Sequence, residues 1–285
     1  MSTTDSAAQA AKAFFSDVTP GWQRWDAQMI DATRPAKEVL LTAVGITPGM
    51  QVLDVATGTG SPALEIVPLV GPQGHVTATD VNPGMVAFAE AKAKRAGLPN
   101  ISFQVADAAD LPFADGQFDA ITCSMGVMFF ARDRALPELH RVLRPGGRIG
   151  FTLWGPYEHN PWLTSIRQPV LRRLRQQPDT AVYAMYESFF HYAKPGTLSA
   201  DLRNAAFRDV QETVLHLTWS FAGSPQEFWA FQSEIGGAAS RPGWDTLTAE
   251  EQAAAEAEVV GLLEPYRVGQ RLEIPVELNL ATATR

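Results

Sequence analysis

The stretch Gln51–Ala63, with the sequence QVLDVATGTGSPA, constrains the fold more than any other part of this chain. A mostly apolar run passes directly into a glycine-rich turn and a helix-compatible segment, which is typical of a buried parallel strand followed by a helix. Gly58 and Gly60 lack a Cβ, so a ligand can approach the main chain of the turn closely. The first N–H groups of the helix near Ser61 face the same place. The stretch therefore predicts an α/β fold with a ligand-binding turn.

The glycine spacing alone leaves the ligand open, because G-x-G-x-x-A also satisfies the dinucleotide-binding fingerprint. Asp54 separates the two interpretations, since a carboxylate within an apolar strand is costly to bury without a partner. The stretch resembles the motif D-x-[AG]-x-G-x-G of the class I, seven-stranded S-adenosylmethionine-dependent methyltransferases. The resemblance implies that Asp54 lies near the methionine end of the cofactor. It also implies that the turn with Ala56, Thr57, Gly58 and Gly60 surrounds the sugar and carboxypropyl parts.

A second acidic residue follows about one βαβ unit later. Residues 75–80 form a β-branched run that ends at Asp80, so its carboxylate is expected beside the glycine turn. There it can accept hydrogen bonds from both hydroxyls of a ribose, and the alternative is an N-cap for the helix near Pro83. Val81 and Met85 are included in the predicted cofactor site.

A third acidic residue follows the predicted strand 101–105. The segment D-A-x-x-L-P-F beginning at Asp107 is similar to a segment of the same family. The resemblance implies that Asp107 accepts a hydrogen bond from the adenine amino group and that the backbone N–H of Ala108 meets a ring nitrogen. An Asx-turn is the alternative for Asp107. Ser124 ends the fourth strand, where the following loop is expected to line the place at which methyl donor and acceptor meet.

The remaining signals complete an α/β fold with a doubly wound, seven-stranded, mostly parallel sheet. The segment H-R-V-L-R-P-G-G-R resembles the family's helix-to-strand turn before the fifth strand, and Asp133 is expected to cap the helix that precedes it. Alternating residues 210–219 and 272–280 predict the last two strands. The resemblance implies that the last strand inserts antiparallel between the fifth and sixth. Helices predicted near residues 180–192, 197–206 and 224–265 would form a helical cap over the acceptor.

Three parts of the chain are therefore expected. Residues 1–46 form an N-terminal helical lid, 47–155 the S-adenosylmethionine-binding core, and 156–285 the cap insertions with the last two strands. Residues 4–15 predict a first helix, and another is expected to begin at Arg34-Pro35. Trp22 and Trp25 share one helix face. They either pack on the core or place one indole over the cofactor, and Trp25 is the residue assigned to that role.

The acceptor side offers fewer signals. Aromatic residues are frequent in the expected cap, and several should face a mostly apolar pocket. His159 and His191 are the candidate bases because imidazole titrates near neutral pH, with a plain surface or packing role as the alternative for each. The [ND]-P-P-[YFW] motif of nitrogen methyltransferases is missing after the fourth strand, and Asn160-Pro161-Trp162 follows the wrong strand.

The composition argues against several other classes of protein. A formal net charge of −8 opposes binding to nucleic acid. The single cysteine, Cys123, excludes an intramolecular disulfide framework and a cysteine-rich zinc site, and no metal is expected. No apolar run reaches the roughly 18 residues that span a bilayer, and the start is unlike a secretory signal. A cytoplasmic protein is expected, with a homodimer as one possible oligomeric state.

The sequence thus predicts an S-adenosylmethionine-dependent methyltransferase that acts on a small, largely apolar or aromatic molecule at oxygen or carbon. It resembles the ubiquinone/menaquinone-biosynthesis type (methyltransferase type 11). A nicotinamide-dependent oxidoreductase shares the glycine turn and Asp80 but explains neither Asp54 nor the segment at Asp107. The third hypothesis is a cofactor-binding protein with a regulatory or rearrangement role.

Overall fold

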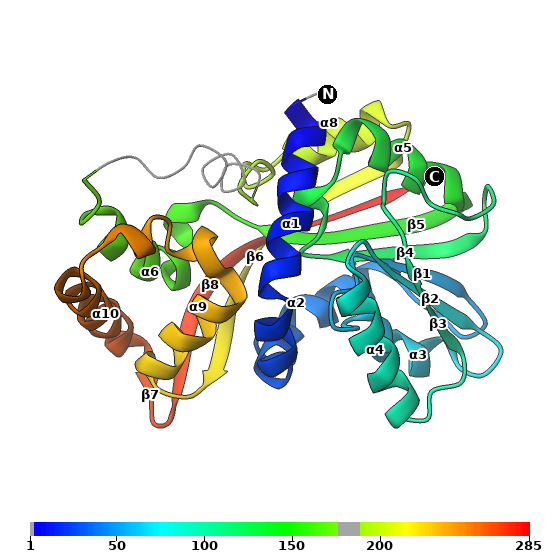
Figure 1. The fold of residues 1–285 in the computed structure, drawn as a ribbon. Coiled ribbons are helices and arrows are strands. Elements are labelled where there is room, and N and C mark those ends of the chain that lie inside the picture. Colours follow the sequence, from blue (N-terminus) through cyan, green and yellow to red (C-terminus); the bar gives the residue numbers. More distant parts are fainter. Residues whose placement is uncertain (1–2, 176–188) are drawn as a thin grey trace.

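A single mixed sheet organises the molecule. The computed structural model describes residues 3–175 and 189–285, and its strands follow the order β3-β2-β1-β4-β5-β8-β6 (Figure 1). The strands are β1 (Gln51–Val55), β2 (His75–Asp80), β3 (Ile101–Val105), β4 (Phe118–Ser124), β5 (Leu143–Trp154), β6 (Arg208–Ala222), β7 (Arg267–Val268) and β8 (Arg271–Thr284). Strands β1 to β5 pair in parallel, and β8 is antiparallel to both β5 and β6. The predicted sheet with an inserted last strand is confirmed, and the two-residue β7 pairs with β8 beside it.

Helices cover both faces of the sheet. They are α1 (Thr3–Arg24), α2 (Asp26–Val44), α3 (Ala63–Val70), α4 (Pro83–Arg95), α5 (Arg132–Val142), α6 (Pro161–Leu171), α8 (Thr197–Asn204), α9 (Pro225–Ser240) and α10 (Ala249–Leu263). Neighbouring residues of β1 enter different cores: Val52 packs with α2 and α3, whereas Leu53 packs with α5 and α8. This two-sided burial explains the mostly apolar sequence of the central strands.

Two predicted helix boundaries are wrong. A helix does not begin at Arg34-Pro35, because α2 runs from Asp26 to Val44 and contains Pro35. Its buried face continues on both sides of the proline, so packing outweighs the lost backbone hydrogen bond. Asp133 does not cap α5, because Ala131 occupies the cap position and Asp133 lies in the first turn. An acidic side chain there still favours the positive end of the helix dipole.

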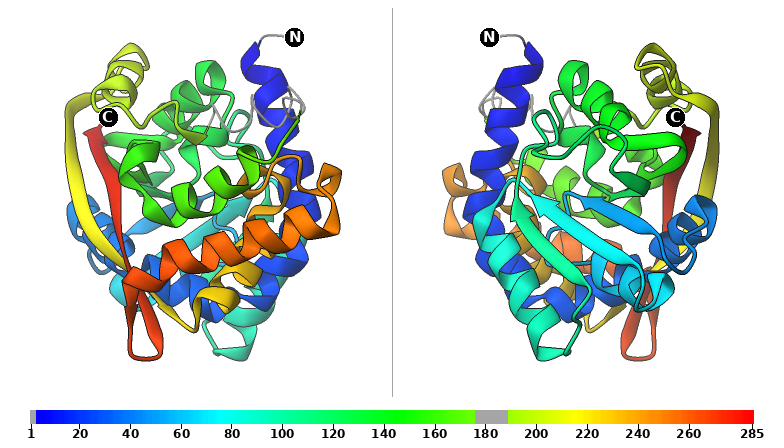
Figure 2. Two further views of the ribbon diagram at one scale, coloured as in Figure 1. Left: turned by 90° about the vertical axis from the view of Figure 1, so that its left-hand side faces the viewer. Right: turned by 90° about the vertical axis from the view of Figure 1, so that its right-hand side faces the viewer.

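The insertions build a second helical region. Helices α6, α9 and α10 pack against the far ends of β6 and β8, and we call this region the cap (Figure 2). A capping box begins α10, since Thr248 and Glu251 each accept a hydrogen bond from the other's backbone N–H. The helix predicted at 197–206 is present as α8. The helix predicted near 180–192 falls mostly outside the described residues.

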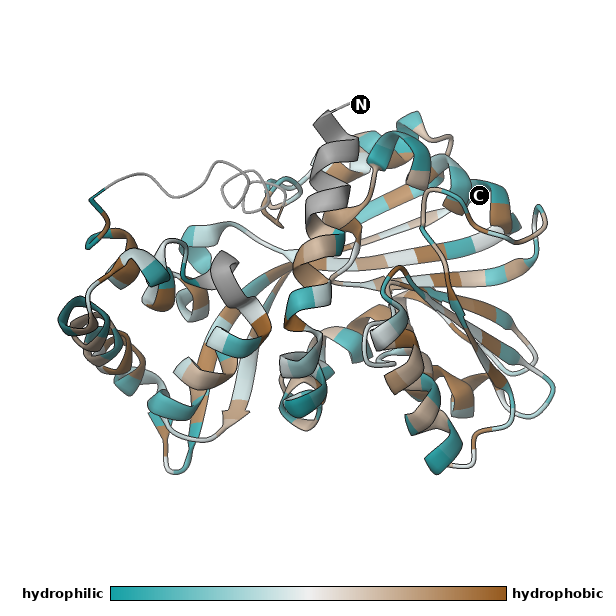
Figure 3. Ribbon diagram, viewed as in Figure 1, coloured by the Kyte–Doolittle hydropathy of each residue, from teal (hydrophilic) through white to brown (hydrophobic). Residues whose placement is uncertain are grey.

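Helix α1 lies between the sheet and the cap in Figure 1, with α2 directly after it. It contacts α9 on the cap side and α4 on the sheet side. Figure 3 shows brown, apolar positions along the strands of the sheet, whereas α4 and α10 carry both brown and teal positions. None of the helices in the described ranges is long and apolar enough to cross a membrane.

Candidate active site

A cavity of about 240 Å³ lies at the carboxyl ends of β1, β2 and β4, and α1, α2, α6 and α9 contribute to its walls. This is the edge at which open α/β sheets bind ligands. The predicted cofactor residues that line it are Ala56, Thr57, Gly58, Asp80, Val81, Met85, Asp107, Ala108 and Ser124. Asp54, Gly60 and Trp25 are absent from this lining. The sequence therefore located most of one continuous wall.

The glycine turn and Asp80 form one hydrogen-bonded unit. Ala56 and Gly58 have φ values of +56° and +54°, which curl the backbone after β1 toward β2. The Gly58 N–H donates to Asp80 Oδ2 at 2.8 Å, and the Asn82 N–H donates to Oδ1 at 2.9 Å. Burial raises the pKa of Asp80 against these two hydrogen bonds. Each carboxylate oxygen keeps acceptor capacity for a further donor from the cavity.

Asp80 is not the N-cap of α4, which was the alternative considered. Asn82 takes that position, and its Oδ1 accepts hydrogen bonds from the backbone N–H groups of Gly84 and Met85. Its Nδ2 donates to Phe15 O and Thr19 Oγ1 of α1. One asparagine thus caps α4 and holds the N-terminal helix beside the glycine turn, which leaves Asp80 available to the cavity.

Asp107 combines two of the expected roles. Its Oδ1 accepts the Ala109 N–H at 3.0 Å, which is the Asx-turn alternative, and the residue also lines the cavity. Its Oδ2 pairs with Lys12 Nζ of α1 at 2.7 Å. Partial burial raises the pKa of Asp107, but the hydrogen bonds from Lys12 and the Ala109 N–H, with the charges of Lys12 and Arg134, together hold the pKa below its usual value. The Lys12 partner had no local signal in the sequence.

Asp54 lies beneath the turn and is not among the residues that line the cavity, so its expected place near the methionine end of the cofactor stays a prediction. Its side chain is fully buried and its Oδ1 accepts the Thr122 hydroxyl at 2.6 Å. Burial raises the pKa of this carboxyl to about 7, and the Thr122 hydrogen bond opposes the shift. The side chain points into the packing between β1 and β4 because Thr122 is opposite it in the register. Asp54 therefore supports the turn from below.

Gly60 also supports the turn without lining the cavity. Its φ is +97°, and a Cβ built on it would lie 3.0 Å from the Cβ of Ala89 in α4. That separation is shorter than ordinary carbon–carbon contact. Gly60 therefore lets the loop approach α4 closely.

Trp22 occupies the place expected for Trp25. Trp22 lines the cavity, and its Nε1 donates to Ile235 O of α9 at 3.1 Å. Trp25 stands at the junction of α1 and α2, packs against Phe221 and Phe231, and donates to Glu234 at 3.0 Å. Both indoles thus face α9, Trp22 through Ile235 and Trp25 through Glu234. Trp25 is not among the residues that line the cavity, and its role at the cofactor stays a prediction.

Neither candidate base lies at the cavity. His159 is exposed on the outer face of the sheet end and its Nδ1 contacts Glu277 Oε2 at 2.8 Å. His191 lies beside Tyr192 and is largely exposed. Partial burial and the positive charge of Arg132 lower its pKa. Neither imidazole is among the residues that line the cavity. The described residues also contain no cluster of His, Cys, Asp or Glu arranged to hold a metal ion.

The loop after β4 forms the centre of the cavity floor. Ser124, Met125 and Gly126 all line it, and Met125 has a φ of +59°, which is unusual for a residue with a long side chain. A Cβ on Gly126 would lie 2.6 Å from the Cβ of Ala56. The loops after β1 and β4 therefore touch, and only glycine allows this approach.

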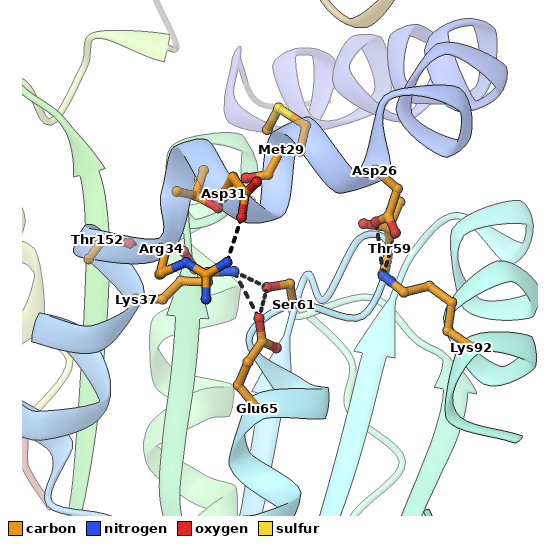
Figure 4. Close-up of polar contacts among 12 residues, drawn as sticks. Asp26, Met29, Asp31, Arg34, Lys37, Thr59, Ser61, Glu65, Lys92 and Thr152 are labelled. Atoms are coloured by element: carbon orange, nitrogen blue, oxygen red, sulfur yellow. Dashed lines mark hydrogen bonds and ion pairs between the residues drawn. The ribbon is translucent and has the colours of Figure 1, made fainter. Parts of the chain in front are cut away.

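Helix α2 is held against the glycine turn by two ion pairs, which the sequence did not reveal (Figure 4). Lys37 is 4% exposed and its Nζ lies 2.8 Å from Glu65 Oε1, with the Ser61 hydroxyl as a second partner. Lys92 of α4 pairs with Asp26 at 2.7 Å and also donates to Thr59 O. These contacts fix the part of α2 that lines the cavity through Met29, Ile30 and Thr33.

The opposite wall is aromatic and comes from distant segments. Trp154, Trp162 and Trp219 pack together, with ring centroids 4.7, 5.1 and 5.8 Å apart. All three line the cavity, as do Phe129 and Phe189. Only Trp162 and Phe189 belong to the expected cap aromatics, whereas Trp154 ends β5 and Trp219 lies within β6. We call this wall the acceptor wall. The donor wall comprises residues 56–61, 80–85 and 106–108.

Sheet order, glycine turn and acidic residues together define the class I, Rossmann-like S-adenosylmethionine-dependent methyltransferase fold. Residues 52–147 match the methyltransferase domain family. The chain is 42% identical over 127 residues to a ubiquinone/menaquinone biosynthesis C-methyltransferase of Rhizobium johnstonii. That match covers 44% of this chain and 46% of the relative, a little under half of each.

Solved structures share the architecture beyond this region. The YcgJ protein from Bacillus subtilis superposes with a TM-score of 0.57 at 18% identity, over 88% of this chain and 98% of that one. The [4+2]-cyclase SpnF superposes with a TM-score of 0.52 at 23% identity, over 88% and 80% of the two chains. At these identities the similarity concerns the fold.

The donor wall fits the cofactor of this class. The turn with positive φ at Ala56 and Gly58 provides a concave backbone, and a Cβ on Gly58 would meet no neighbouring atom within 4 Å, so space lies beside it. Asp80 has acceptor capacity for ribose hydroxyls, and Ala108 lines the same wall further along. The residues of the donor wall are therefore suited to binding a nucleoside.

Proposed function

We propose that this protein transfers a methyl group from S-adenosylmethionine to a small, largely apolar or aromatic molecule, at oxygen or carbon. The observation that carries the proposal is a single cavity with two unlike walls. The donor wall presents Gly58, Asp80 and Asp107, and the acceptor wall presents packed tryptophans. The match of residues 52–147 to a methyltransferase domain favours this reaction over the oxidoreductase alternative.

S-adenosylmethionine supplies an electrophilic methyl group when bound. The chain's own contribution is to hold the nucleoside, to exclude water and to align the acceptor. Asp80 and the adjoining turn hold the ribose, while Asp107 and Ala108 hold the adenine. The apolar acceptor wall keeps water away, which favours a displacement in which charge is lost. Holding the methyl donor and the acceptor in line across one cavity lowers the barrier to the reaction further.

We expect the methyl acceptor to lose its proton without a general base from the protein. The charged side chains that line the described part of the cavity are Lys12, Asp80 and Asp107, and all three belong to or adjoin the donor wall. With no imidazole in that lining, suitable acceptors are acidic phenols or enols, whose nucleophilic atom is activated by its own chemistry. A small-molecule partner and a cytoplasmic location form part of the same proposal, with residues 1–46 as a lid.

Two measurements test the proposal. Calorimetry with S-adenosylhomocysteine should show binding at micromolar to submillimolar concentration, and no heat at millimolar ligand would contradict the cofactor assignment. Incubation with methyl-labelled S-adenosylmethionine and a panel of phenols and enols should then yield a labelled product. Cofactor binding together with an unlabelled, rearranged product would instead support the rearrangement hypothesis.

A further inference from the structure

The C-terminal end of α1 is fixed to the cap. A Cβ built on Gly21 would lie only 2.5 Å from Glu234 O, so the backbones of α1 and α9 cross closely here. Beside this crossing, Trp22 Nε1 donates to Ile235 O at 3.1 Å. Gln23 Nε2 donates to a backbone carbonyl of the first turn of α4 at 3.3 Å. This end of the helix is therefore held from two sides.

Asn82 attaches the preceding part of α1 to the donor wall. Its Nδ2 donates to Phe15 O at 3.1 Å and to Thr19 Oγ1 at 2.8 Å. The same side chain caps α4 through Oδ1, and its backbone N–H donates to Asp80 Oδ1 at 2.9 Å. Asn82 is 6% exposed and is not among the residues that line the cavity. Both donor hydrogens of its amide are therefore engaged by α1.

The other polar contact of this part of α1 is weaker. Lys12 pairs with Asp107, but the two side chains are 45% and 39% exposed, and ion pairs of this kind contribute little. Phe15 meets Phe129 edge to face at a centroid distance of 4.9 Å. Among the described residues, the hydrogen bonds from the buried Asn82 are therefore the strongest polar attachment of residues 11–19 to the donor wall.

Pro20 lies between the two parts of α1. It stands inside the helix and has no N–H, so the helix lacks the backbone hydrogen bond to Ser16 O. Sharp bends in helices occur mostly at proline and where a backbone hydrogen bond is missing. Residues 11–19 can therefore turn about Pro20 while Trp22 stays on α9.

The part of α1 held by Asn82 covers the donor wall. The helix lies between the sheet and the cap in Figure 1, and its cavity-lining residues before Pro20 are Ala11, Lys12, Phe14 and Phe15. A nucleoside bound at Asp80 would contact these side chains only while residues 11–19 are docked. Docking of the helix and binding of the nucleoside therefore stabilise each other.

We propose that residues 11–19 of α1 form a gate over the cofactor site, that Pro20 is its hinge, and that Asn82 is the positioning residue that holds the gate closed. This inference rests on the proposed function and its N-terminal lid. It adds which part of the lid moves and which side chain controls the movement. The cofactor enters and leaves when the hydrogen bonds from Asn82 Nδ2 to α1 are broken.

A gate has a kinetic signature that a lost ligand contact does not share. Entry and release both require the open form, so a weaker attachment raises the open fraction in the free and in the bound protein. The association and dissociation rates of S-adenosylhomocysteine then rise by the same factor, and Kd stays unchanged. Removal of a direct contact with the ligand instead raises the dissociation rate and Kd together.

Two variants weaken the attachment outside the cavity. Thr19→Val keeps the shape but removes the hydroxyl that accepts from Asn82, so both rates should rise about fivefold. Asn82→Ser removes both hydrogen bonds to α1 but keeps a side-chain oxygen that caps α4, so both rates should rise about tenfold. Association is measured by rapid mixing with labelled S-adenosylhomocysteine, and dissociation by a chase with the unlabelled compound.

Two further variants serve as a control and as a change of opposite sign. The Thr42 hydroxyl donates to Glu38 O in α2 just as the Thr19 hydroxyl donates to Phe15 O, and Thr42 is exposed. Thr42→Val should therefore leave both rates unchanged. Pro20→Ala restores an N–H for Ser16 O and stiffens the hinge, so both rates should fall about threefold.

Hydrogen exchange follows the gate directly and needs no ligand. In Thr19→Val, the amides of residues 11–19 should exchange about fivefold faster than in the wild-type protein, because local opening becomes more frequent. The amides of residues 85–95 in α4 should stay within about twofold, because the Asn82 cap is intact. Mass spectrometry of peptides from both regions makes the comparison within one sample.

Several outcomes would overturn the inference. A higher dissociation rate with an equal loss of affinity would show that α1 contacts the ligand without controlling its entry. Unchanged rates in Thr19→Val and Asn82→Ser, or unchanged exchange of residues 11–19, would show that Asn82 does not hold the gate. Each of these results with intact S-adenosylhomocysteine binding would leave the proposed function standing. Absence of binding in the wild-type protein would refute the proposed function, and the exchange data would still decide the role of Asn82.

Discussion

The two walls of the cavity are built in different ways. The donor wall consists of short chain segments in which the backbone makes the contacts, as in the Gly58 N–H that meets Asp80. The acceptor wall is assembled from β5, α6 and β6 together with Phe129 and Phe189, and its contacts are between rings, as between Trp154 and Trp219. Backbone geometry fixes the donor wall almost independently of side-chain size. The acceptor wall depends on the volume of each residue, so it is the wall that can be adapted to different substrates.

The largest expected effect concerns the support beneath the donor wall. The Asp54 pKa is raised from 3.8 to about 7 in the folded protein, so the folded state holds its proton more strongly than the unfolded state. Stability from this group is therefore present below about pH 4 and is lost as pH rises toward 7. Asp54→Asn removes this loss, and it should stabilise the protein by up to about 4 kcal/mol at pH 8 and by little at pH 4. Denaturant unfolding of both proteins at the two pH values measures the difference. An equal difference in the free energy of unfolding at both pH values would contradict the burial of an ionised Asp54.

The next effect tests whether cofactor binding belongs to the donor wall alone. Asp80→Ala removes the carboxylate that holds the turn and faces the cavity, and it should weaken S-adenosylhomocysteine binding about 100-fold. Asp115→Ala, at an exposed acid that follows the Asp107 segment, is the control and should have no such effect. Calorimetry checks both variants. Equal losses of affinity in the two variants would show that the effect of Asp80→Ala is not specific to the donor wall.

A steric substitution tests the contact between the loops after β1 and β4. Gly126→Ala places a Cβ 2.6 Å from Ala56 and 2.9 Å from the Cys123 sulfur, so it should destabilise the protein by about 1–3 kcal/mol. Gly261→Ala lies in α10, where no atom is within 4 Å of the new Cβ, and it should stabilise by about 1 kcal/mol. Thermal unfolding compares them. A harmless Gly126→Ala would show that the loops are not pressed together.

The smallest effect concerns the ion pair between α1 and the donor wall. Lys12→Ala frees Asp107 Oδ2 for the adenine amino group, and it should tighten S-adenosylhomocysteine binding about two- to threefold because a half-exposed pair is weak. Lys94→Ala on the exposed side of α4 serves as the control. Titration at low and high salt checks the result. Weaker binding after Lys12→Ala would show instead that Lys12 contributes directly to the cofactor site.

The difference between the two walls also explains which residues could be predicted from the sequence. Strands β1 to β4 and the residues Asp80 and Asp107 were predicted because each is marked by a short local pattern that ends at a known edge of the sheet. Asp54 does not line the cavity, and the pattern that gives its strand did not indicate the hydroxyl of Thr122 opposite it.

The acceptor wall was largely missed for the complementary reason. Trp154 and Trp219 are far apart in the sequence and meet only because β8 lies between their strands. His159 and His191 were chosen for their chemistry, yet the fold turns both outward. Trp25 was assigned to the cofactor whereas Trp22 lines the cavity, because a shared helix face does not indicate which of two indoles reaches it.

The long strands β6 and β8 bear on how such a protein can be re-engineered. Residues Leu278–Thr284 of β8 pair with β5, and the preceding part of the strand continues into the cap while remaining paired with β6. A graft that replaced the cap would cut two strands of the central sheet and leave open edges prone to association. New substrate preferences are therefore better sought by exchanging individual side chains than by transplanting whole segments between relatives.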